Sequence, residues 1–329
     1  MNLSAHVQAG LICPACKANL QTRGDELTCT NSACAVTYPV LSGIPILIAP
    51  SLSTFDASDC TKAESPGGSP AASWRETIQK MVPRISLNVA ARENYRKFHD
   101  RLLQWSNRPL VLVIGGAHLG EGMEELVRDQ RTEFVETDIV ATGRTRIVSD
   151  AHVLPFASGL FDGVIIQAVL EYLLEPARSV AEIHRVLKPG GFVYSEMPFM
   201  QQVHGGMYDF TRLTHLGHRV LYRQFSHIDS GACGGPGMAL AWSLQYFLLS
   251  FASGQASRNA VKVLTRCCFF WLKYFDRYLA AKGGGLDAAA GTYFLGRKSE
   301  QELSNRELIQ FYRGAVPADF RRFERNAHA

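Results

Sequence analysis

The sequence has little charge, few cysteines and no long apolar run. Asp, Glu, Lys and Arg make up 19% of the 329 residues, against about 25% in an average globular protein, and 47% are hydrophobic. A mostly disordered chain is excluded, because disorder requires low hydrophobicity and high net charge. The net charge of +4 is too small by itself to indicate a nucleic-acid-binding protein. At about 150 residues per domain, the length predicts about two domains.

The absence of a long apolar run excludes the usual membrane-spanning pattern. Residues Met238 to Ala252 form the most apolar stretch, but Ser243 and Gln245 interrupt it, and a spanning helix needs about 20 apolar residues. The first ten residues contain no Lys or Arg and no apolar core, so they do not predict a secretory signal. We therefore expect a cytoplasmic protein, where clustered cysteines more often bind metal than form disulfides.

Four of the eight cysteines lie within the first 34 residues, as one Cys-x2-Cys pair and one Cys-x4-Cys pair. Two such pairs on opposed hairpin turns can place four thiolates around Zn²⁺ at tetrahedral corners. Because every ligand is then sulfur and no position remains for water, such a site is structural. The alternative is a small hairpin module with four reduced thiols. We predict a structural zinc site formed by Cys13, Cys16, Cys29 and Cys34.

The residues around this cluster carry a family resemblance. The Cys13-Pro-Ala-Cys16 pair is followed by Tyr38-Pro39-Val40 and by Gly43-Ile44-Pro45. In this order the motifs resemble the small zinc-ribbon family that partners and activates tRNA methyltransferases. The resemblance covers about residues 10–50 and implies a zinc-ribbon module over residues 1–50, through which a protein partner could dock.

The middle of the chain predicts an α/β sheet. Residues 51–73 are rich in Ser, Ala, Pro and Gly and indicate a flexible linker, and helical periodicity follows from residue 74 to residue 105. Leu110 to Ile114 is an apolar run typical of a buried parallel strand, and it ends in a glycine-rich turn. A helix near Met123 to Asp129 would present free N–H groups to a ligand. Alternation of strands and helices predicts a Rossmann-like, doubly wound, mostly parallel sheet, with further strands at 134–139, 147–151, 161–166 and 192–197.

Residues 108–200 resemble the class I S-adenosylmethionine-dependent methyltransferases, most closely their type-11 branch. The resemblance depends on Asp150 to Phe156, on Phe161-Asp162 and on Glu182 to Gly191. It implies that the turn lines the methionine part of S-adenosylmethionine, that Asp138 binds the ribose, and that Asp150 with Ala151 borders the adenine. The spacing of Asp138, about 20 residues beyond the turn, also suits a ribose-binding acid. The candidate cofactor-binding residues are Gly115, Gly116, Ala117, Gly120, Asp138, Asp150, Ala151 and Gln167.

The sequence departs from this family pattern at two positions. Val113 stands where the family carries an acid, two residues before the first glycine, and Ala117 replaces the third glycine of the turn. These departures leave open a degenerate, non-catalytic scaffold.

The loop after the last parallel strand is the candidate acceptor site, since ligands bind beyond the carboxyl ends of parallel strands. It contains His204, Asp209 and Arg212. His204 is a candidate general base, Asp209 can orient it or take the proton, and Arg212 can bind an anion. The alternative is a local Asp209–Arg212 salt bridge at i, i+3. The loop looks like that of bacterial methyltransferases encoded with sugar and surface-polysaccharide biosynthesis, which implies an oxygen acceptor on a saccharide or lipid-linked saccharide.

A predicted helical insertion over residues 236–285 separates the last two strands of a methyltransferase domain that we place at 74–299, before a helical tail at 300–329. Residues 254–282 contain six basic and one acidic residue, a net charge of +5. On a helical wheel the basic face lies beside an aromatic face, which is typical of a helix at a membrane interface. We expect peripheral contact with an anionic membrane at its inner face; the alternative is a helical cap. The basic face comprises Arg258, Lys262, Arg266, Lys273 and Arg277.

A second enzymatic interpretation is an RNA (tRNA or rRNA) methyltransferase whose ribbon grips RNA. Between residues 11 and 48, however, Lys17 and Arg23 are the only Lys or Arg residues, too few for binding driven by phosphate contacts.

Overall fold

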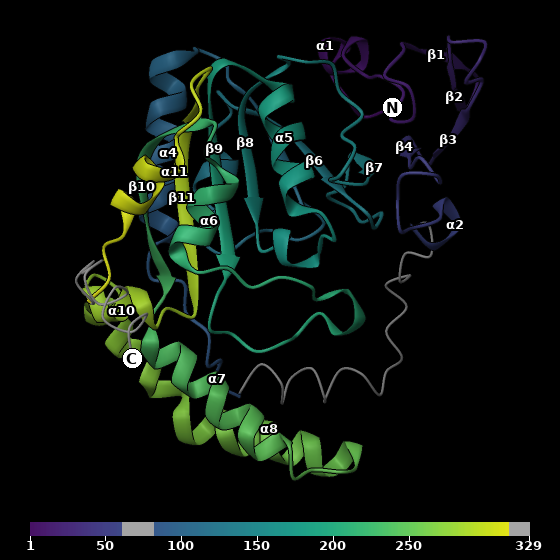
Figure 1. Cartoon of the computed structure of the whole chain (residues 1–329). Coiled ribbons are helices and arrows are strands. Elements are labelled where there is room, and N and C mark those ends of the chain that lie inside the picture. Colours follow the sequence, from purple (N-terminus) through teal and green to yellow (C-terminus); the bar gives the residue numbers. More distant parts are fainter. Residues whose placement is uncertain (61–81, 316–329) are drawn as a thin grey trace, which may run out of the picture.

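The fold is built on one sheet in a computed structural model that describes residues 1–60 and 82–315 (Figure 1). Its strand order is β1-β2-β3-β4-β7-β6-β5-β8-β9-β11-β10. The five strands from β7 to β9 in this order are parallel, and β11 lies antiparallel between β9 and β10. This order confirms the predicted Rossmann-like α/β fold. These strands are β5 (Leu110–Ile114), β6 (Glu133–Asp138), β7 (Ile147–Ser149), β8 (Phe161–Gln167), β9 (Leu187–Pro198), β10 (Phe225–Gly234) and β11 (Gly291–Lys298).

Helices cover both faces of the parallel strands, as Figure 1 shows. On one face the buried side chains of Phe98 and Leu102 pack with Val111. On the other face Val180 and Ile183 belong to a second buried cluster. Continuous apolar strands between two helical layers are what a parallel sheet requires. The covering helices are α4 (Ala91–Trp105) on the first face, and α5 (Pro176–Val186) and α6 (His215–Leu221) on the second.

The helix predicted at Met123 to Asp129 is wrong. The chain forms turns there and one short 3₁₀ segment, η1 (Leu126–Arg128). Gly122 has a φ of +91°, and a Cβ at this position would lie 2.7 Å from the Cβ of Ala91 at the start of α4. The backbone is thus held in a left-handed turn against α4 directly before the point where the predicted helix would begin. Free N–H groups near the turn cannot come from a helix terminus.

The cysteine-rich segment is joined to the main sheet and shares its core. Its last strand pairs in parallel with β7 at the sheet edge. Buried Val7, Leu11 and Tyr38 belong to the same apolar cluster as the central strands, and the Lys17 ammonium lies 2.8 Å from the Glu182 carboxylate on α5. The segment contains α1 (Ala5–Ala9), β1 (Leu20–Arg23), β2 (Glu26–Cys29), β3 (Thr37–Leu41) and β4 (Ile44–Leu47).

The linker predicted at 51–73 differs from the structure over its first ten residues. A short helix, α2 (Ala57–Cys60), follows β4, and Cys60 is buried in a cluster with Ile46, Ile48 and Val148. Apolar contacts of Phe55 and Cys60 hold this stretch on the sheet edge despite its Ser-rich composition. Residues 61–73 of the predicted linker lie outside the described residues.

Between β10 and β11 the chain forms a helical hairpin at the carboxyl ends of the parallel strands (Figure 1). The buried Asp276 carboxylate anchors it by accepting hydrogen bonds from the backbone N–H groups of Gly235, Gly237 and Met238 at 2.7–3.2 Å. The hairpin comprises α7 (Pro236–Leu249), α8 (Gln255–Phe269), η4 (Phe270–Phe275), α9 (Asp276–Leu279) and α10 (Gly283–Asp287).

The predicted basic face is wrong in part, because it assumed one continuous α-helix. The helix changes to 3₁₀ geometry at Phe270, which alters the rotation per residue. Lys273 is buried, and its ammonium donates to the backbone oxygens of Arg84 and Ser86 at 2.5 and 3.4 Å. Lys273 therefore fixes the hairpin to the segment before α4 and does not face solvent.

The chain after β11 forms two short helical segments, α11 (Asn305–Leu308) and η5 (Ile309–Phe311), within the predicted tail. Among the residues described, none of the helices is both long enough and apolar enough to span a membrane.

Candidate functional site

A cavity of about 370 Å³ lies at the carboxyl ends of the parallel strands. Gly115 lines it directly after β5, Gln167 at the end of β8 and Pro198 at the end of β9. Cys233 of β10 and Met238 of α7 close another wall. Parallel strands therefore bring residues that are far apart in the sequence into one ligand-sized space.

The three glycines of the turn lie so close to their neighbours that no side chain fits at these positions. Gly115 has a φ of +79°, and a Cβ there would collide with the side chain of Val169. A Cβ at Gly116 would lie 2.7 Å from the Cβ of Glu136, and one at Gly120 would collide with the amide oxygen of Gln167. The N–H groups of Gly115 and Gly116 both donate to the Thr137 oxygen at 2.9 Å, which fixes the turn on β6.

The predicted cofactor residues divide into two groups. Gly115, Gly120 and Gln167 line the cavity, whereas Gly116, Ala117, Asp138, Asp150 and Ala151 do not. Asp138 lies beside the turn, where its carboxylate accepts the Ala117 N–H at 3.0 Å. The Asp150 carboxylate accepts hydrogen bonds from the Ser53 hydroxyl at 2.5 Å and from the backbone N–H of His152 at 2.8 Å.

Of the three predicted catalytic residues, His204 lines the cavity and the other two organise its loop. The Asp209 side chain is 1% exposed, pairs with Arg212, and accepts the N–H groups of His204 and Gly205 at 2.8 and 3.1 Å. Burial raises the pKa of Asp209, but Arg212 and these N–H donors outweigh it and lower the pKa to about 2. Arg212 also donates to the Gln201 oxygen at 2.9 Å. The local salt bridge considered as the alternative is thus present.

Glu171 is a cavity residue to which the sequence analysis gave no role. It lies on η2 (Leu170–Tyr172) after β8 and is fully buried, and neither carboxyl oxygen accepts a hydrogen bond from another described residue. Burial raises its pKa to about 7. Its backbone oxygen accepts the N–H groups of Phe210 and Thr211 at 2.8 and 3.2 Å, which ties it to the loop that carries His204. The only signal in the sequence was its position directly after a parallel strand.

Glu196 near the end of β9 was also missed, because the sequence placed it inside a strand. Its carboxylate accepts both the Asn88 amide, at 2.9 and 2.8 Å, and the Gln167 amide, at 2.8 Å, and also the Tyr194 hydroxyl. Burial raises its pKa. With Glu121, the cavity has three acidic lining residues, whereas no Lys or Arg of the described chain lines it. Its electrostatics suit a ligand that carries positive charge.

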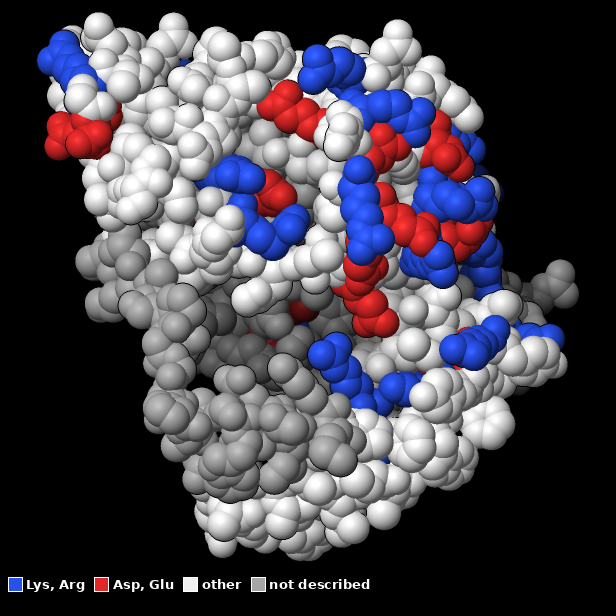
Figure 2. All heavy atoms as spheres, turned by 180° about the vertical axis from the view of Figure 1, so that it is seen from behind, with Lys and Arg blue, Asp and Glu red and all other residues white. Residues whose placement is uncertain are grey.

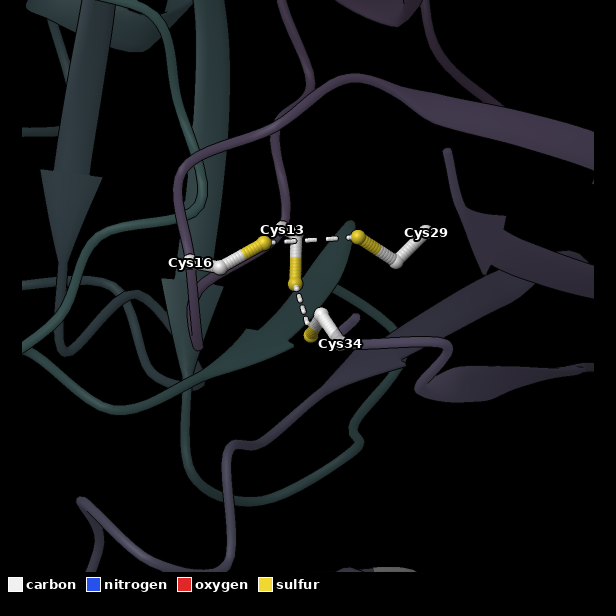
Figure 3. Close-up of side chains that lie close together, drawn as sticks. All are labelled: Cys13, Cys16, Cys29 and Cys34. Carbon is white, nitrogen blue, oxygen red and sulfur yellow. Dashed lines mark hydrogen bonds between the residues drawn. The ribbon is translucent and has the colours of Figure 1, made fainter. Parts of the chain in front are cut away.

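The four cysteines of the N-terminal segment converge from two loops, with their sulfurs facing one another (Figure 3). The Cys16 and Cys29 sulfurs lie 3.4 Å apart and those of Cys13 and Cys34 lie 3.9 Å apart, and all four lie within 4.8 Å of one another. Tetrahedral Zn–S bonds of about 2.3 Å place sulfurs about 3.8 Å apart. The Ala18 N–H lowers the pKa of the Cys16 thiol to about 7, which favours the thiolate.

Comparison with known proteins bears on the central segment. Residues 116–195 match the family model described as "Methyltransferase domain". This segment is therefore similar to a methyltransferase domain. It is 38% identical over 91 residues to the demethylmenaquinone methyltransferase of Clavibacter sepedonicus, and 33% identical over 107 residues to the ubiquinone/menaquinone biosynthesis C-methyltransferase UbiE of Coxiella burnetii. These alignments cover 25% and 28% of this chain, and 32% and 42% of the relatives' lengths.

Solved structures show more distant likeness. The Haloferax volcanii complex of the Trm112 methyltransferase activator with a putative methyltransferase aligns at 16% identity and a TM-score of 0.39, over 66% of this chain and 96% of that one. A putative sarcosine dimethylglycine methyltransferase from Galdieria sulphuraria aligns at 14% identity and a TM-score of 0.42, over 69% and 98%. Because both TM-scores are below 0.5, the fold assignment depends on the strand order of the sheet and on the match to the family model, and not on these structures.

We expect Glu171→Gln to stabilise the protein at high pH and not at low pH. The folded-state pKa of about 7 lies above the ordinary value of 4.5, so the native state loses stability as pH rises from about 4.5 to about 7, where the carboxyl is ionised in the unfolded chain but still protonated in the folded one. The free energy of unfolding of the variant should exceed that of the wild type by up to about 3 kcal/mol at pH 8. At pH 4.5 the two free energies should be almost equal. Urea unfolding at both pH values measures this, with exposed Glu124→Gln as the control. An equal difference at both pH values contradicts the prediction.

Proposed function

We propose that this protein is an S-adenosylmethionine-dependent methyltransferase that methylates an oxygen of a saccharide or lipid-linked saccharide. The observation that carries the proposal is the cavity, which has the glycine turn on one wall and His204 with the buried Glu171 on another. It lies beyond the carboxyl ends of the parallel strands in a chain with a methyltransferase domain.

The residues present fit the cofactor. Glycines leave room for close approach at the turn, and the amide oxygen of Gln167 is a buried acceptor without a partner in the described chain. The described part of the chain lines the cavity with three acidic residues and with no Lys or Arg, which suits a molecule with sulfonium and ammonium charges. In this proposal the turn 115–120 and Gln167 hold the methionine part, Asp138 holds the ribose, and Asp150 with Ala151 borders the adenine. The bound cofactor supplies an electrophilic methyl group.

The protein's own contribution is alignment and proton removal. Holding an acceptor hydroxyl in line with the methyl group lowers the entropic part of the barrier. A base with a pKa near the working pH then takes the hydroxyl proton, and the Glu171 carboxyl, with a pKa of about 7, meets that requirement. His204 is the second candidate base, since it lines the same cavity. Asp209 and Arg212 act as positioning residues, because they fix the loop that carries His204.

The cavity lining also bears on the choice of acceptor. A neutral hydroxyl needs no cation at the reaction centre, which agrees with a lining without Lys or Arg among the described residues. The RNA alternative is weakened because Lys17, one of two cations of the ribbon, pairs with Glu182 at 2.8 Å. Both enzymatic proposals require the protein to bind S-adenosylmethionine, whereas a non-catalytic scaffold does not. A measurement of cofactor binding therefore distinguishes them from the scaffold.

The four cysteines constitute a structural zinc site in this proposal, and the ribbon is a surface on which a protein partner can dock. The sulfur spacing supports the zinc assignment, since it agrees with tetrahedral thiolate coordination. Because Cys13 and Cys29 also belong to the buried cluster of the central sheet, the metal would stabilise the whole domain.

In this proposal the protein is cytoplasmic, and the helical hairpin docks on the inner face of an anionic membrane. Figure 2 shows that the lower end of that view is largely uncharged, whereas acidic and basic side chains gather above it. Phe251 is 76% exposed and Phe247 is 63% exposed on α7 and its C-terminal turn. The cations of Arg277 and Lys282 lie over the exposed rings of Tyr274 and Tyr278. Exposed aromatic rings beside cations suit a membrane interface.

We expect removal of the metal to destabilise the whole chain. Cys29→Ser should abolish stoichiometric zinc and lower the melting temperature by roughly 5–10 °C, equivalent to about 3 kcal/mol, because the module shares its core with the sheet. Elemental analysis and calorimetric melting measure both effects. The exposed Cys267→Ser is the matched control. A wild type free of zinc after expression in zinc-supplemented medium would contradict the site.

The acceptor is tested with methyl-labelled S-adenosylmethionine and fractionated cell extract. We expect label in the lipid fraction and its release into water by mild acid, which cleaves sugar–pyrophosphate links. Glu171→Gln should reduce incorporation by roughly 100-fold or more if the carboxylate is the base. Label that stays in RNA after lipid extraction would instead favour the RNA enzyme, and no incorporation into any fraction would favour the scaffold.

Membrane docking is tested by flotation with vesicles. At low salt we expect the wild type to float with vesicles of phosphatidylglycerol and not with those of phosphatidylcholine. The double variant Phe247→Ser/Phe251→Ser should lose most of this binding, whereas Leu41→Ser, at an exposed apolar position of the ribbon, should retain it. Absence of wild-type flotation with anionic vesicles would eliminate the membrane proposal.

A further inference from the structure

Glu196 and Gln167 lie on the same face of the sheet as Val113, the position at which the family pattern has an acid. Val113 pairs with Ile165, and Ile165 pairs with Tyr194 across the next strand. Because side chains alternate along a strand, residues two positions further on point to the same face. Gln167 and Glu196 are those residues, and they pair with each other at the cavity end of β8 and β9. The carboxylate absent at position 113 thus has a counterpart two strands away.

The amide of Gln167 is oriented so that an acceptor atom meets the glycine turn. Its Nε2 donates to Glu196 Oε2 at 2.8 Å and to the Glu121 backbone oxygen at 3.4 Å. Its Oε1 is buried without a hydrogen-bond partner in the described chain, and it lies so close to Gly120 that a Cβ there would collide with it. A ligand against this turn can therefore donate a hydrogen bond to Gln167.

The Glu196 carboxylate is held rigidly and, among the residues that the structure describes, has no cationic partner. The Asn88 Nδ2 donates to both of its oxygens, while Asn88 Oδ1 accepts the N–H groups of Ala90 and Ala91 at the start of α4. Glu196 is 5% exposed, and none of the described Lys, Arg or His side chains forms an ion pair with it. A buried carboxylate without a counter-charge is unfavourable, so a bound cation at this place would be strongly stabilised.

We infer that Gln167 and Glu196 form the subsite for the ammonium group of the cofactor's methionine part, in place of an acid at position 113. This inference rests on the proposed function. The ammonium is a compact cation with three N–H donors. One donor meets the free Gln167 Oε1, and the charge is balanced by Glu196, whose carboxylate also fixes the direction of the Gln167 amide. Gly120 is required because its missing side chain leaves the Gln167 oxygen room against the turn.

Two ligands that differ in the amino-acid group test the inference by calorimetry. S-adenosylhomocysteine carries the ammonium, whereas 5′-methylthioadenosine has the same nucleoside and sulfur without it. Glu196→Gln keeps the shape of the side chain. We expect it to lower the affinity for S-adenosylhomocysteine at least tenfold and to leave the affinity for 5′-methylthioadenosine within twofold of the wild-type value. The exchange variant Gln167→Glu/Glu196→Gln restores one carboxylate to the pair and should recover most of the lost affinity. Glu124→Gln, at an exposed position four residues beyond the turn, should change neither value.

Each other outcome has a definite meaning. If Glu196→Gln weakens both ligands equally, Glu196 supports the fold of the cavity and the inference is overturned. Unchanged affinity for both ligands also overturns it, as does an exchange variant no better than Glu196→Gln alone. If the wild type binds neither ligand, the proposed function itself fails. Unfolding curves of each variant establish that a loss of binding is not a loss of folding.

Discussion

The close approach of the glycine turn to the strands beside β5 is the constraint on which the cavity depends. Gly115 lies against Val169, Gly116 against Glu136 and Gly120 against the Gln167 amide, at distances that exclude a side chain at these three positions. Since the turn has no helix behind it, its position is set by these contacts and by the hydrogen bonds to Thr137. A ligand at the turn therefore meets the backbone of the glycines and not the terminus of a helix.

The cysteine-rich segment is coupled to this cavity through the edge of the sheet. β4 extends the sheet beyond β7, and Ser53, a few residues later, donates a hydrogen bond to Asp150 at the carboxyl end of β7. The module and the candidate adenine-binding acid are thus parts of one packed structure. A metal that orders the four cysteines would also order the chain that contacts Asp150. In this arrangement the proposed zinc would have a structural role that extends to the candidate cofactor site.

The sequence was a good guide to the sheet and the cysteine cluster, because apolar runs and cysteine spacing are local signals. It failed where tertiary contacts decide the outcome. Where a helix was expected after the turn, the chain packs on α4 at Gly122 and forms turns, and Lys273 is buried because α8 gives way to a 3₁₀ segment. Glu171 and Glu196 could not be singled out, since their importance lies in burial and missing partners, which one sequence does not display.

The central claim is that the cavity beside the glycine turn binds S-adenosylmethionine. A crystal structure with S-adenosylhomocysteine tests it most directly. The account predicts the sulfur and amino-acid group of the ligand against the turn 115–120, with the ammonium at Gln167 and the nucleoside extending toward Asp138 and Asp150. A ligand bound elsewhere, or an empty cavity in crystals grown at millimolar ligand, would contradict it.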